Sequence, residues 1–143
     1  MEVETLTEQL LFVTVRITTL TSDGRAGSGT GFLLSEERAD GGTALLVVTN
    51  KHVIEGASTV TMHFLAASSI NSPELGLERT LTATPDLFVG HLDPEIDVAM
   101  IGVGGALQQL ADAGTPAFYR SVSTSMCATK QVLQDFEPIE PVC

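Results

Sequence analysis

Residues 46–57, LVVTNKHVIEGA, join an apolar run to a histidine within a few positions. Leu46, Val47 and Val48 are typical of a buried β-strand, whereas residues 49–52 are polar. Gly56 then indicates a tight turn. The stretch therefore predicts that His52 lies at the end of a buried strand, where an imidazole can face a cleft.

Similar short apolar or alternating runs, separated by turn residues, occur along most of the chain. This pattern is typical of many short strands. We expect six strands, at residues 10–19, 30–35, 43–49, 59–66, 79–83 and 98–103. The intervening polar stretches are expected to be turns or loops, including 21–29, 36–42 and a loop around Asn71, Ser72 and Pro73. The fold class expected is all-β, a small closed six-stranded antiparallel β-barrel, because closure removes exposed sheet edges.

The strand-like pattern of apolar residues ends at Gly104 and Gly105. Residues 106–114, ALQQLADAG, have a helical composition, and the remaining residues show no clear core pattern. We therefore expect a β-barrel at residues 1–105 and a connecting segment with a short helix at residues 106–143.

Composition and charge exclude several classes of function. The 143 residues include 18 acidic and 7 basic side chains, a net charge of −11, which disfavours nucleic acid and membrane surfaces as partners. The apolar runs are too short to span a bilayer, and the acidic beginning of the chain differs from a signal peptide. Cys127 and Cys143 are too few for a disulfide framework, so a cytoplasmic location is expected.

A second ionisable group precedes another apolar strand. Asp97 stands in EIDVAMIGV at residues 95–103. An aspartate that accepts a proton from histidine Nδ1 leaves Nε2 free as a general base. Taken singly, His52 could instead be a core or turn histidine, and Asp97 a turn acid at a strand end. Lys51 is expected to be exposed.

No cofactor or metal is expected. The glycines of GSGTG, residues 27–31, are not followed by a lysine and lead into a strand, so they indicate a turn or bulge and not a phosphate-binding loop. His52, His63 and His91 have no metal-binding spacing, and the cysteines are far from them in sequence.

Three segments, in the order GSGTGFLLS, VVTNKHVIEGA and EIDVAMIGV, carry a resemblance to a known family. Together they resemble the first barrel of the chymotrypsin-like (trypsin-like) serine peptidases, in particular the bacterial branch related to the HtrA proteases. The resemblance covers roughly residues 10–105. It implies a polypeptide substrate, with His52 as the general base and Asp97 as the group that orients it.

The resemblance is incomplete, because the family serine lies in a G-[DN]-S-G-G-like segment of a second barrel. This sequence has no such segment, and Ser121, Ser123 and Ser125 lack flanking glycines, so no nucleophile is assigned. Residues 106–143 then correspond to the connector and the start of a second barrel that is missing here. An uncovered barrel face predicts self-association.

We therefore expect a serine endopeptidase in which this chain supplies the histidine and aspartate of a Ser-His-Asp triad. The alternative is a noncatalytic, protease-derived barrel that acts as a binding or regulatory module.

Overall fold

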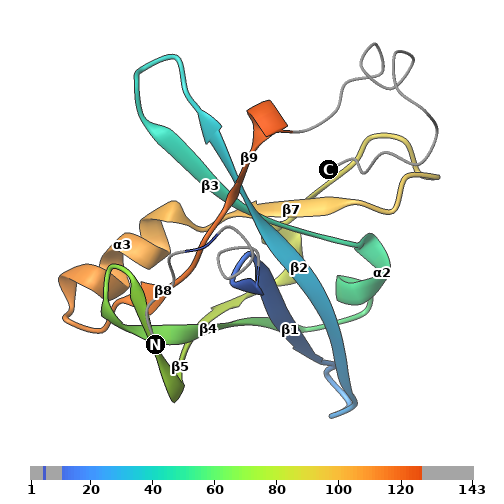
Figure 1. The fold of residues 1–143 in the computed structure, drawn as a ribbon. Coiled ribbons are helices and arrows are strands. Elements are labelled where there is room, and N and C mark those ends of the chain that lie inside the picture. Colours follow the sequence, from blue (N-terminus) through green and yellow to red (C-terminus); the bar gives the residue numbers. More distant parts are fainter. Residues whose placement is uncertain (1–4, 6–10, 127–143) are drawn as a thin grey trace.

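A nine-stranded sheet forms most of the described part of the protein (Figure 1). The computed structural model describes Thr5 and residues 11–126. The strands are β1 (Thr14–Leu20), β2 (Ala26–Glu37), β3 (Thr43–Thr49), β4 (Thr59–Ser69), β5 (Ser72–Ala83), β6 (Val89–Gly90), β7 (Ala99–Gly102), β8 (Ala117–Phe118) and β9 (Val122–Ser123). The helices are α2 (Lys51–Ile54) and α3 (Gly104–Asp112), with 3-10 turns η1 (Pro85–Leu87) and η2 (Thr124–Met126).

The strands pair in the order β5-β4-β1-β2-β3-β7-β6, and every pair along this path is antiparallel. Strand β8 pairs with β4, and β9 lies parallel to β2. The all-β class predicted from the sequence is therefore confirmed. Within the described residues the path does not return from β6 to β5, so closure of the sheet into a barrel is not confirmed.

The core is built from the inward-facing positions of the alternating strands. Its largest fully buried side chains are those of Val15, Ile17, Leu33, Val47, Val60 and Met62. They belong to four neighbouring strands, and period-two alternation places them on one face of the sheet. Burial of this apolar face is the main favourable contribution to the stability of the fold.

Two strands begin earlier than the sequence predicted. Strand β5 begins at Ser72, so the loop expected around residues 71–73 is wrong, and only Ile70 and Asn71 separate it from β4. Pro73 pairs with Ala67 beside an irregularity in register, on an end strand of the pairing order, where a missing N–H is tolerated. Strand β2 begins at Ala26, inside the predicted turn at 21–29.

The GSGTG glycines lie in strand β2, and the turn or bulge predicted there is wrong because the pairing of β1 with β2 is continuous. Glycine is needed at these positions because other parts of the chain lie close to the backbone of β2. A Cβ on Gly29 would lie 2.7 Å from Val53 Cγ1, and a Cβ on Gly31 would lie 2.7 Å from the Val48 carbonyl oxygen. Gly29 thus lets helix α2 pack against β2, close to His52.

Replacing Gly31 with alanine is expected to destabilise the protein by about 1–3 kcal/mol, because the new methyl group meets a backbone carbonyl that cannot rotate away. Gly102→Ala is the matched control, since a Cβ there meets nothing within 4 Å. Urea denaturation measures both changes in the free energy of unfolding. Equal stability of the two variants would contradict the close contact between Gly31 and the Val48 carbonyl.

The helix predicted from ALQQLADAG is confirmed as α3, and it packs on the sheet through buried Leu107. Phe118 of β8 is also buried. Residues 127–143, with both cysteines, lie outside the described part, so the division at residue 105 stays a prediction. Within the described part, the helices are too short to span a membrane.

Candidate active site

His52 lies in a single turn of helix just beyond the C-terminal end of strand β3. Thr49, the last residue of β3, is buried, and its hydroxyl donates to the Thr30 carbonyl at 2.9 Å. Helix α2 follows and contains His52. The chain then leaves the helix through Gly56, whose φ of +77° favours glycine. The tight turn predicted at Gly56 is therefore preceded by one turn of helix.

Sheet register brings Asp97 to His52. Strands β3 and β7 are antiparallel, and Thr49 lies opposite Ala99. The residues that follow β3 therefore lie beside those that precede β7. This pairing joins two segments that are far apart in the sequence, and Asp97 lies two residues before Ala99.

The carboxylate of Asp97 holds His52 through two atoms. Asp97 Oδ2 hydrogen-bonds with His52 Nδ1, and Oδ1 accepts from the His52 backbone N–H at 3.0 Å. Because the carboxylate accepts at Nδ1, the neutral imidazole carries its proton there and Nε2 has a free lone pair. The His52 side chain is 70% exposed and that of Asp97 45%, so Nε2 is accessible to a reacting group.

A second set of hydrogen bonds holds the loop that carries Asp97 against α2. Asn50 Nδ2 donates to the Asp97 carbonyl at 2.8 Å, and Lys51 Nζ donates to the His91 and Asp93 carbonyls at 2.7 and 3.1 Å. The loop is closed at its base by the His91 N–H, which donates to the Val98 carbonyl at 2.8 Å. The side chains of the two residues that precede His52 therefore help to position the aspartate.

Lys51 is half-buried, so the prediction that it is exposed is wrong. Its ammonium group binds backbone carbonyls, and its stem lies against Gly90, where an added Cβ would come 3.1 Å from Lys51 Cε. No pattern in the sequence indicates this role. Every residue has a backbone carbonyl, so the partners of Lys51 cannot be recognised by their residue type.

His52 lowers the pKa of Asp97. The largest cause is the hydrogen bond with the imidazole. Partial burial of the carboxyl group raises the pKa, and the backbone N–H and the charge of His52 lower it by smaller amounts. Because the pKa of Asp97 is lowered in the folded protein, its contact with His52 stabilises the fold at pH values above the ordinary pKa of a carboxyl group. The stabilisation is lost as the pH falls through the lowered pKa.

Removing the imidazole should therefore raise the pKa of Asp97. In His52→Ala, the Asp97 carboxyl is expected to titrate at a higher pH than in the unmodified protein, as followed by the ¹³C shift of Cγ. His63→Ala is the control, because the His63 side chain contacts Thr18 and Glu78 and not this carboxylate. An unchanged midpoint in His52→Ala would contradict the contact.

His63 belongs to a different cluster, on strands β1, β4 and β5. Its Nε2 lies 2.8 Å from the Thr18 hydroxyl, and its Nδ1 lies 3.2 Å from both Glu78 Oε2 and Arg16 Nη2. Arg16 and Glu78 form a half-exposed ion pair at 2.8 Å. Arg16, and after it His63, lower the pKa of Glu78. The three strands thus share one polar network, and exposed pairs of this kind add little stability.

The remaining candidates have structural partners. His91 Nδ1 accepts from the Asp93 N–H at 3.0 Å, which orders the loop before Asp97. Ser123 and Ser125 lie 2.9 Å apart, hydroxyl to hydroxyl. Among residues 11–126, no group of three or more histidine, cysteine or acidic side chains could hold a metal ion.

The two residues selected from the sequence, His52 and Asp97, are therefore in direct contact, and their catalytic role stays a prediction. No protein-family model matches this chain, and no curated protein or solved structure does so either.

Proposed function

We propose that His52 and Asp97 are the base and the orienting acid of a serine-type endopeptidase related to the trypsin-like peptidases. The observation that carries the proposal is the Asp97 carboxylate, which bridges the imidazole Nδ1 and the backbone N–H of His52. This arrangement leaves Nε2 free, as removal of a proton from a hydroxyl nucleophile requires.

Each residue then has a distinct part in peptide-bond hydrolysis. His52 Nε2 takes the proton of the attacking serine and returns it to the leaving amine. Asp97 fixes the tautomer and stabilises the imidazolium that forms. Asn50 and Lys51 are positioning residues, because they bind the backbone of the loop that carries Asp97.

The serine would come from a polypeptide that covers this face of the molecule. Apolar side chains on the segment before Asp97 support such a cover, since Leu87 and Val89 are exposed and Leu92 is 99% exposed. A second barrel or another copy of the chain would bury them. The cytoplasmic location and the polypeptide substrate are part of the same proposal.

The sequence also favours a second candidate, a noncatalytic binding or regulatory module. The specific observation is that the sequence has no G-[DN]-S-G-G-like segment, and that Ser121, Ser123 and Ser125 lack flanking glycines. In that case the same face binds a partner protein, and the His52–Asp97 contact only orders the loop.

A fluorophosphonate probe separates the two candidates. The gene is read beyond the codon for Cys143, and the protein is expressed with whatever follows. For the peptidase we expect covalent labelling at a serine, its loss in His52→Ala, and its retention in the His63→Ala control, since His63 contacts Thr18 and Glu78 and not the loop that carries Asp97. A stop codon at that point, or labelling that is insensitive to His52→Ala, would leave the module.

A further inference from the structure

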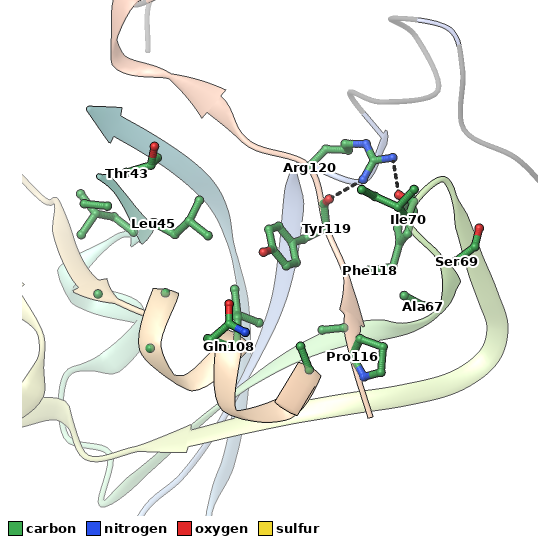
Figure 2. Close-up of a pocket in the computed structure, with 18 of the residues that line it drawn as sticks. Thr43, Leu45, Ala67, Ser69, Ile70, Gln108, Pro116, Phe118, Tyr119 and Arg120 are labelled. Carbon is green, nitrogen blue, oxygen red and sulfur yellow. Dashed lines mark hydrogen bonds between the residues drawn. The ribbon is translucent and has the colours of Figure 1, made fainter. Parts of the chain in front are cut away.

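A large cleft lies at the other end of the molecule from His52 and Asp97. Its volume is about 990 Å³, and it runs between α3, β3, β8 and the turn that joins β4 to β5 (Figure 2). Helix α3 and helix α2 lie on opposite sides in Figure 1. We call it the α3 cleft. Neither His52 nor Asp97 lines it.

The floor of the α3 cleft is apolar. Leu107 and Phe118 are buried, and Leu45 and Tyr119 are half-buried beside them. Figure 2 shows the Tyr119 ring between β3 and β8, with Leu45 and Gln108 on the facing side. Three glycines, Gly102, Gly104 and Gly105, line the cleft without filling it. A Cβ at Gly102 or Gly105 would meet nothing within 4 Å, so the space is open to a ligand.

The charge of the α3 cleft is opposite to that of the chain. Arg38 and Arg120 line it, and none of the described residues that line it is acidic. The whole chain carries 18 acidic and only 7 basic side chains. The cleft is thus a local basic region on an acidic protein, which favours an anionic ligand and disfavours a cationic one.

The two guanidinium groups differ in how firmly they are held. Arg120 lies 4.5 Å from the centroid of the Phe118 ring and donates to the Ile70 carbonyl at 3.0 Å and to Asn71 Oδ1 at 3.3 Å. Arg38 is 58% exposed, and its Nε is 3.6 Å from Asp40 Oδ1, a loose ion pair. Arg120 therefore presents a fixed charge, and Arg38 can turn toward a ligand carboxylate.

We propose that the α3 cleft binds a peptide segment in which acidic and apolar side chains alternate. The apolar side chains would cover the floor, and the carboxylates would pair with the arginines. An open cleft of this size is at the upper end of small-molecule sites and suits an extended segment of several residues. A small anion would engage the arginines and leave the apolar floor exposed.

The test is fluorescence polarisation with a fluorescein-labelled peptide of sequence LDFELD. We expect saturable binding that Arg38→Glu weakens about tenfold, because one charged contact becomes repulsive. Arg25→Glu is the matched control, because it makes the same charge change at the β1–β2 turn, outside the cleft, and should leave binding unchanged.

A second variant tests whether the peptide occupies the open space of the α3 cleft. Gly105→Leu adds a side chain where there is open space, and is expected to weaken binding at least tenfold. Gln109→Leu is its control on the same helix, since Gln109 is exposed and does not line the cleft. Circular dichroism checks that both variants fold.

Two further peptides separate charge from apolar contact. The uncharged LNFQLN and the polar SDSESD should both bind more weakly than LDFELD, because each lacks one of the two contributions. Equal binding of SDSESD, displacement of LDFELD by inorganic phosphate at the same concentration, or equal losses in Arg38→Glu and Arg25→Glu would each overturn the proposal, as would the absence of saturable binding.

Binding in the α3 cleft is independent of the proposed peptidase chemistry. His52→Ala should therefore leave the affinity for LDFELD unchanged while it abolishes fluorophosphonate labelling. Failure of one proposal is thereby distinguishable from failure of the other.

Discussion

Replacing Asp97 with asparagine is expected to lower peptide turnover by about 10⁴-fold in the protein that contains the proposed serine. Asparagine keeps the shape of the side chain but can present an amide donor to His52 Nδ1. The imidazole then favours the tautomer with its proton on Nε2, which cannot act as the base. The measurement is kcat for a peptide substrate.

Glu95→Gln is the control for this prediction, because it removes the same charge from an exposed position in the same loop. Its turnover should equal that of the unmodified protein. ¹⁵N spectra of the imidazole supply a readout other than activity, since the proton is expected on Nδ1 in the unmodified protein and not in Asp97→Asn. Normal turnover in Asp97→Asn would remove Asp97 from the mechanism.

Replacing Ile17 with alanine is expected to lower the free energy of unfolding by about 2–5 kcal/mol. Ile17 is in the middle of β1, is 0% exposed, and belongs to the core cluster. Truncation removes buried methyl and methylene groups and leaves a cavity, because strands on both sides of β1 hold its backbone in place. Urea denaturation measures the loss, and the slope of the unfolding free energy against urea concentration should stay unchanged.

The matched control makes the same truncation on the surface. Ile70, in the turn between β4 and β5, is 85% exposed, so Ile70→Ala should change stability by less than about 0.5 kcal/mol. Similar losses in the two variants would mean that β1 is not at the centre of the core.

The strands that pack the core were predictable because their signal is local. The alternating runs at residues 10–19 and 59–66 and the apolar run at 43–49 correspond to β1, β4 and β3, although β1 begins only at Thr14 and β4 continues to Ser69. Strand β5 was predicted only in its last part. Its exposed leucines, Leu75 and Leu77, and its Pro73 break the pattern that marks a half-buried strand.

The candidate site was only partly predictable. His52 and Asp97 were selected from their places at the ends of apolar runs, and from the resemblance to the peptidases. Their contact depends on the register of β3 against β7, which pairs Thr49 with Ala99. Register is set by the packing of the whole sheet, so no window of sequence around either residue contains it.

The amino-acid sequence by itself determined the class of fold, the buried strands and the two residues with the capacity for proton transfer, because each follows from local periodicity or from side-chain chemistry. Only the tertiary structure decided that Asp97 reaches His52, that Lys51 holds the loop, and that Arg38 and Arg120 line one cleft. The physical reason is that these features join segments far apart in the chain, whose relative positions are set by strand pairing and core packing.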